Sequence, residues 1–351
     1  MTLTSLTLAG KGVLAKLDSE LDLIQRAMDR FTGGDPHVNR MAIANLLVAL
    51  KSKRMIILLD DAQSHGTALI RTMTHILIGD NHLQCQILTG HPWWVGAPGA
   101  SNVLTTFHTR FVTDKILAVM EEASQPENSG QVYFACLSQI SLAELSSCFV
   151  DVAYQLSHGE IMRIGDVHFS KPMRYPSNMW LLGTMDESQM NLINKNLMSE
   201  SMVLHGQSVE MKSHAPQSGN DWKGYQTTFL RSCIRSRQAA YHKLQSILSE
   251  HGTTLAPFLN VVQGLKKNGF SLPSSVLDHC VIYLANAFSI RGLGLFDPIT
   301  CRNLEIASDL AIEQVLLTRS RDKIWSSRRI RLEMYDLLRT FPRSRAFLGA
   351  V

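Results

Sequence analysis

The feature of this sequence that most constrains its fold is an apolar run that ends abruptly in a polar turn. It lies in residues 54–69, RMIILLDDAQSHGTAL, where the apolar residues 55–59 precede two aspartates and a helical pattern follows. A short apolar run bounded by turn residues is typical of a strand buried on both faces, as in a parallel sheet. The stretch therefore predicts a strand, a loop and a helix in succession.

The same stretch has the layout of a phosphate-binding loop, G-x-x-x-x-G-K-[ST], in which glycines, a lysine and a hydroxyl hold phosphates and Mg²⁺. Asp60 and His65 take the two glycine positions, while Gly66 and Thr67 take the lysine and hydroxyl positions. Only Thr67 fits the pattern. The carboxylates of Asp60 and Asp61 oppose the binding of a polyanion, so the layout is present without its chemistry.

Composition is that of a soluble globular protein. The 351 residues, 45% hydrophobic and 18% charged, suffice for a large core and a second, smaller domain. We expect a cytoplasmic protein without a membrane partner, because no apolar run is long enough to span a bilayer and the N-terminus lacks a secretory pattern. The six cysteines are scattered and include no C-x-x-C pair, which indicates neither a disulfide framework nor a zinc site.

Positive charge is concentrated near the end of the chain. Residues 319–345 contain nine basic and three acidic side chains, although the whole chain carries a net charge of only +4. Such a run is either a solvated helix face or a docking surface for phosphates or an acidic partner subunit. The candidate docking residues are Arg319, Arg321, Lys323, Arg328, Arg329 and Arg331.

Further apolar runs of strand length, at 84–89, 132–137, 179–182 and 201–205, alternate with helical patterns. This alternation predicts a doubly wound α/β fold with a mostly parallel sheet. We expect a helical lead-in over 1–53, an α/β core over 54–212, a polar linker over 213–224 and an all-helical C-terminal domain over 225–351.

A strand and helix at 131–156 have the layout of a Walker B segment, where an Asp–Glu pair normally holds Mg²⁺ and polarises the attacking water. Ser138 and Gln139 take these positions and carry no charge. The segment 175–204 then resembles the sensor-1 region of McrB-like AAA+ ATPases through PSNMWLLGTMDES, which includes Thr184. Asp186 follows Met185 directly and either replaces the sensor asparagine or joins across a short deletion. The segment for the trans-acting arginine finger contains Met198 and Ser199 instead.

The order and spacing of these pieces extend the resemblance over most of residues 45–321. It implies a P-loop NTPase-like (AAA+) fold with an all-helical C-terminal lid. It also implies a degenerate nucleotide site made of Asp60, Asp61, Ser64, His65, Gly66, Thr67, Ser138, Gln139, Thr184 and Asp186. Because the lysine, the Asp–Glu pair, the asparagine and the arginine are all missing or displaced, we expect an ATPase-dead member without ATP or Mg²⁺ as a cofactor.

A catalytically inactive member would act through its surfaces. AAA+ modules associate side by side, and McrB-like ATPases serve bacterial systems against foreign DNA, usually as oligomers with a nuclease partner. The resemblance therefore implies a structural or regulatory subunit of a defence complex. Its partners would be copies of itself or active AAA+ or nuclease subunits, and DNA would be reached through the complex.

Two alternatives from other classes remain open. The first is an enzyme whose metal site is built from Asp60, Asp61, His65, Asp186 and Glu187, all near the ends of expected strands. The second is a nucleic-acid-binding subunit that uses the arginine-rich end, with stacking on Trp325 or on the loop of Trp93 and Trp94.

Overall fold

A computed structural model describes residues 19–32, 35–60, 65–79, 83–89, 102–140, 145–159, 174–206, 212–213, 230 and 233–349. The chain forms two compact units. The α/β unit comprises residues 30–39 and 53–227, and the helical unit comprises residues 1–29, 40–52 and 228–351. The N-terminal helical residues 40–52 thus group with the C-terminal helices, whereas the helical pattern of the sequence predicted residues 1–53 as a separate lead-in.

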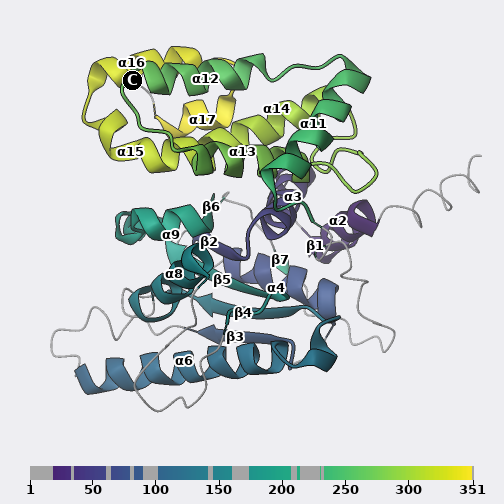
Figure 1. Cartoon of the computed structure of the whole chain (residues 1–351), viewed down its shortest axis with the longest axis vertical. Coiled ribbons are helices and arrows are strands. Elements are labelled where there is room, and N and C mark those ends of the chain that lie inside the picture. The colour runs from purple at the N-terminus through teal and green to yellow at the C-terminus, as the bar shows by residue number, and fades with distance from the viewer. Residues whose placement is uncertain are drawn as a thin grey trace, which may run out of the picture. The chain divides into compact units, whose positions relative to one another are not determined.

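The α/β unit contains a five-stranded sheet in which every pairing is parallel. Its strand order is β3 (Cys85–Thr89), β4 (Tyr133–Ser138), β5 (Met179–Asp186), β2 (Met55–Asp60) and β6 (Ser201–His205), as Figure 1 shows. The expected α/β fold with a parallel sheet is therefore confirmed. A separate antiparallel pair joins β1 (Phe31–Thr32) to β7 (Lys212–Ser213), which places strand at the start of the expected linker. The rest of that linker, 214–224, lies outside the described residues.

Helices connect the strands of the sheet. They are α4 (His65–Ile78), α6 (Asn102–Ala123), the π-helix η2 (Leu145–Phe149) with α8 (Val150–His158), and α9 (Lys195–Glu200). Two short 3₁₀ helices, η1 (Pro126–Asn128) and η3 (Glu187–Leu192), complete the connections. Crossovers of this kind are what parallel strands require.

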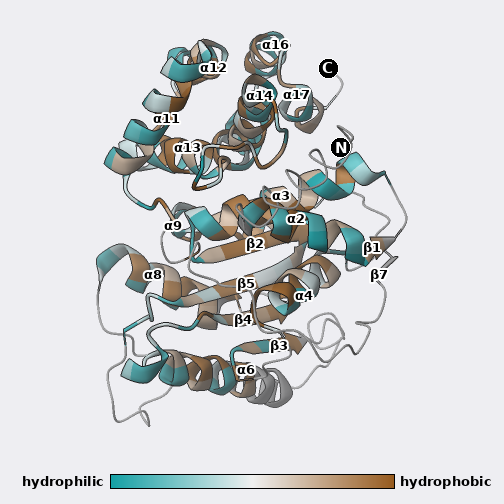
Figure 2. Cartoon of the chain, turned by 90° about the vertical axis from the view of Figure 1, so that its right-hand side faces the viewer, coloured by the Kyte–Doolittle hydropathy of each residue, from teal (hydrophilic) through white to brown (hydrophobic). Residues whose placement is uncertain are grey.

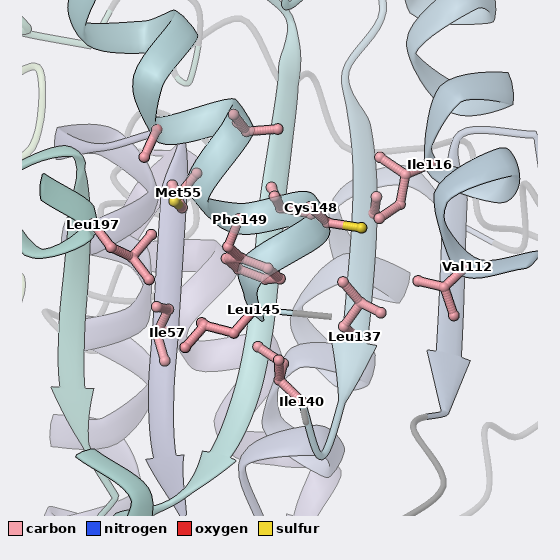
Figure 3. Close-up of a cluster of buried hydrophobic side chains, with 14 of the residues drawn as sticks. Met55, Ile57, Val112, Ile116, Leu137, Ile140, Leu145, Cys148, Phe149 and Leu197 are labelled. Carbon is pink, nitrogen blue, oxygen red and sulfur yellow. The ribbon is translucent and has the colours of Figure 1, made fainter. Parts of the chain in front are cut away.

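The main core of the α/β unit lies on one face of the sheet. Met55 and Ile57 of β2 pack there in one cluster with Leu137 of β4, Phe149 of η2 and Leu197 of α9 (Figure 3). Successive side chains of a strand alternate between faces, so the neighbours of these residues point to the opposite face, where α4 packs against the sheet. Burial on both faces explains why the strands are continuous apolar runs in the sequence.

One position in this core requires glycine because neighbouring side chains lie very close to its backbone. A Cβ built on Gly183 of β5 would overlap the side chains of Ile140 and Phe149. We expect Gly183→Ala to lower the free energy of unfolding by about 1–3 kcal/mol, the usual cost of overpacking a well-packed core. Urea denaturation followed by circular dichroism measures this loss. Adding Ile140→Val removes the methyl group that the new side chain would meet, so the double variant should cost less than the sum of the two single changes.

The helical unit is built from α2 (Ser19–Arg30), most of α3 (Pro36–Ser52) and the helices that follow residue 233. Figure 2 labels most of these helices. Those after residue 233 are α11 (Arg237–His251), α12 (Ala256–Lys267), α13 (Ser274–Asn286), α14 (Thr300–Ala311), the π-helix η4 (Ile312–Leu317), α15 (Thr318–Trp325), α16 (Arg328–Leu337) and α17 (Pro342–Phe347). All six cysteines are free. None of the helices in the described ranges combines the length and the apolarity needed to cross a membrane.

Candidate functional site

The sheet has a topological switch point beside β2. The chain leaves β2 through α4 toward β3, and it leaves β5 through α9 toward β6 on the other side of β2. Ligands of open α/β sheets bind in the crevice that such diverging connections open at the carboxyl ends of the strands. Asp60 and Asp186 are register partners at this edge, so the fold brings together strand ends that are far apart in the sequence.

Three hydroxyl side chains meet at this edge, and we call them the hydroxyl cluster. Thr67 lies in the first turn of α4, Ser138 ends β4, and Thr184 belongs to β5. The Thr67 Oγ1 atom lies 2.8 Å from Ser138 Oγ and 3.3 Å from Thr184 Oγ1. Ser138 and Thr184 are only 8% and 2% exposed, so these hydrogen bonds are largely shielded from water.

The turn after β4 is held to the same cluster. The backbone N–H of Gln139 donates to Thr184 Oγ1 at 2.9 Å, and the N–H of Ile140 donates to the Thr184 carbonyl oxygen at 2.7 Å. Gln139 has a φ of 56°, in the left-handed region that residues other than glycine seldom adopt. Backbone in this region persists where the surroundings determine it, and here the bonds to Thr184 do so.

The hydroxyl cluster consists of neutral groups. In a working P-loop site, the hydroxyl of the loop and a Walker B carboxylate hold Mg²⁺ beside the phosphates. The sequence alignment predicts Thr67 and Ser138 at these two positions, and in the structure they hydrogen-bond directly to each other. Hydroxyl groups hydrogen-bond well but supply no charge to neutralise a divalent cation. The arrangement therefore fixes α4 to β4 and β5.

Asp186 is engaged in a local cap. Its Oδ1 atom accepts from the Ser188 hydroxyl at 2.5 Å and from the Ser188 N–H at 2.8 Å, at the start of η3. These hydrogen bonds, the hydroxyl first and the backbone second, lower the pKa of the Asp186 carboxyl. The carboxylate thus serves a 3₁₀ helix, as capping aspartates commonly do.

A second polar pair at this edge was not found from the sequence. The Nδ1 atom of His205, the last residue of β6, lies 3.6 Å from Glu187 Oε1. His205 is buried and pairs in register with Leu59, so it lies beside the end of β2. One signal in the sequence could have pointed to His205, which ends an apolar run. In a parallel sheet, the last residue of such a run lies at the carboxyl edge of the sheet.

The remaining expected site residues are distributed as follows. Asp61, Ser64 and the loop of Trp93 and Trp94 lie outside the described residues, and for Asp60 only the backbone is described. His65 and Gly66 are half-buried in the first turn of α4. Within the described ranges, no three His, Cys, Asp or Glu side chains gather as a metal-binding group.

The segment expected to carry an arginine finger has structural contacts instead. Met198 of α9 packs against the core cluster of the sheet. The Ser199 hydroxyl donates to the Asn196 carbonyl at 2.7 Å, and the Ser199 carbonyl accepts from Lys53 Nζ at 2.9 Å. The expected docking residues 319–331 belong to α15 and α16 of the helical unit.

No model of a protein family matches the chain, and no curated protein sequence matches it.

Proposed function

We propose that this chain is a catalytically inactive McrB-like AAA+ homologue that works as a structural or regulatory subunit of an oligomeric complex in cytoplasmic defence against foreign DNA. The observation that carries the proposal is the hydroxyl cluster, in which Thr67 and Ser138 hydrogen-bond to each other where a P-loop ATPase holds its metal. The parallel sheet and the helix α4 surround the cluster, while Thr67 and Ser138 supply none of the charges that hydrolysis needs.

The strand order supports this kinship. In dinucleotide-binding and flavodoxin-like sheets, the first strand lies beside the second. Here β2, the first strand of the sheet, is separated from the second, β3, by β5 and β4. On the proposed resemblance, the Walker A and Walker B strands are β2 and β4, and β5 lies between them. The carboxyl edge at β2 is thus the expected location of a nucleotide.

Phosphoryl transfer depends almost entirely on positioning and electrostatic stabilisation. Gly66 takes the place of the phosphate-binding lysine, and Ser138 and Gln139 take the places of the metal-binding and water-polarising acids. Asp186, in place of the sensor asparagine, caps η3 through Ser188. Loss of all these groups together favours a scaffold whose function lies in its interfaces with other subunits, either copies of itself or active AAA+ or nuclease partners.

The test is a calorimetric titration of the purified protein with ATP and Mg²⁺, run beside an ATPase assay and light scattering. We expect no heat of binding, no turnover and a mass above that of one chain. The isosteric variant Thr67→Val is the control, because Thr67 is the one residue of the loop that still fits the phosphate-binding pattern.

The control distinguishes ATP hydrolysis at this site from hydrolysis by a contaminating ATPase. Turnover by the wild-type protein that disappears in Thr67→Val would place ATP hydrolysis in this site and overturn the proposal of an inactive homologue. Turnover of equal size in both proteins would come from another ATPase in the preparation. A mass of one chain at all concentrations, also in mixtures with active AAA+ subunits, would overturn the proposed role in an oligomer.

A further inference from the structure

The helical unit carries a basic–aromatic surface, which we define as Arg321, Trp325, Arg328, Arg329 and Arg331 of α15 and α16. Trp325 is 44% exposed. The guanidinium carbon of Arg331 lies 5.5 Å from the centroid of the Trp325 ring, and that of Arg321 lies 6.0 Å from it. Arg328 and Arg329, at the start of α16, are exposed.

This surface belongs to a segment that holds more than the net positive charge of the whole protein. Residues 319–345 contain nine basic and three acidic residues, a balance of +6, while the chain as a whole is +4, so the remaining residues sum to −2. Some of this charge is neutralised inside the unit, since Arg343 pairs with Glu313 at 3.2 Å. Among the described residues, Arg328, Arg329 and Arg331 take part in no ion pair.

The placement of these arginines is unfavourable for the helix that carries them. The first turn of α16 contains Arg328, Arg329 and Arg331. This first turn contains no acidic residue. Cations at a helix N-terminus oppose the helix macrodipole and so destabilise the helix. Helix stability therefore does not explain why arginines are gathered here.

We propose that the basic–aromatic surface binds duplex DNA through its phosphate backbone. Duplex DNA offers one phosphate charge per ~1.7 Å of axis, a density that scattered carboxylates on an acidic protein do not reach. Arginine matches phosphate through paired N–H donors, and all four cations of the surface are arginine. Stacking of single-stranded bases is the weaker alternative, because the ring of Trp325 is already in contact with two guanidinium groups.

The experiment measures fluorescence anisotropy of a labelled DNA duplex against the full chain at several salt concentrations. In the triple variant Arg328→Gln, Arg329→Gln and Arg331→Gln, we expect affinity at low salt to fall at least about tenfold. The slope of log affinity against log salt should fall by about 2–3, because each lost phosphate contact removes about 0.9. The single variant Arg329→Gln should lower the slope by about 1 and serves if the triple variant folds poorly.

The matched control removes the same charge elsewhere on the helical unit, at the exposed Arg237, Arg291 and Arg302. Its salt slope should stay within about 1 of the wild-type value. Equal losses in the triple variant and the control would overturn the proposal in favour of a nonspecific effect of net charge. Tighter binding of single strands or of polyglutamate than of duplex would overturn it as well, as would the absence of salt-dependent binding.

Discussion

Replacing Lys51 with methionine should lower the free energy of unfolding by about 3–5 kcal/mol, the usual cost of removing one partner from a buried ion pair. The Lys51 Nζ atom lies 2.5 Å from Glu20 Oε1, and the two side chains are 3% and 1% exposed. Lys51 also donates to the carbonyl oxygens of Asn286 and Phe288 at 2.8 and 3.0 Å. One side chain thus joins α2, α3 and the end of α13.

The loss is large because the variant leaves a carboxylate without its cation. The second oxygen of Glu20 accepts from the N–H of Ile290 at 2.7 Å, so Glu20 stays fixed in the interior when Lys51 is gone. Urea denaturation followed by circular dichroism measures the effect. Combining Lys51→Met with Glu20→Leu should recover part of the stability, since a buried pair replaced by apolar groups is often neutral.

Lys243 provides the matched control for this experiment. Its Nζ atom donates to the carbonyl oxygens of Phe288 and Ser289 at 2.8 and 2.9 Å, so it serves the same turn as Lys51. Lys243 is only half-buried, and we expect Lys243→Met to cost about 1 kcal/mol. If Lys51→Met lowered the free energy of unfolding by less than Lys243→Met does, a central role of the buried pair would be contradicted.

The sheet could be read from the sequence because burial on both faces leaves a one-dimensional signal. The run at 55–59 lies within β2, and the run at 201–205 coincides with β6. The apolar run at 179–182 was too short, since β5 continues to Asp186 through Gly183 and Thr184, residues that a hydrophobicity pattern does not count as strand. Position 183 is occupied by glycine because Ile140 and Phe149 fill the space that a side chain would need.

Three residues of the candidate site were singled out from the sequence, but their arrangement was not. Thr67, Ser138 and Thr184 were each placed by alignment with P-loop motifs, and the structure brings them within hydrogen-bonding distance. That they bond to one another depends on the order of β4, β5 and β2 in the sheet, which the chain order does not determine. The same holds for Lys51 and Glu20, whose pairing joins two helices of the helical unit.

The grouping of the N-terminal helices with the C-terminal helices could also not be predicted from the sequence. Asn45 of α3 accepts from the hydroxyl of Tyr283 at 2.6 Å, and Ser52 Oγ accepts from Asn286 Nδ2 at 3.2 Å. These contacts link segments more than two hundred residues apart within one compact unit. Periodicity predicts helices one at a time, whereas contacts of this range follow only from the complete fold.

Replacing Asp309 with alanine should lower the free energy of unfolding by about 3 kcal/mol, because two buried hydrogen bonds to a charged group are lost. Asp309 of α14 is 4% exposed. Its carboxylate oxygens accept from the N–H groups of Arg343 and Ser344 at 2.9 and 2.8 Å, and the Ser344 hydroxyl donates to the Asp309 carbonyl at 2.8 Å. Asp309 therefore caps α17 from another helix.

Two variants test whether these bonds carry the effect. Asp309→Asn keeps one carbonyl acceptor and should cost about half as much, whereas Asp297→Ala removes an exposed acceptor from the N–H of Ile299 and should cost about 1 kcal/mol. Urea denaturation ranks the three variants. Equal losses in Asp309→Ala and Asp297→Ala would show that α17 holds its place by apolar packing, for which Leu348 and Phe341, both nearly fully buried, are the available residues.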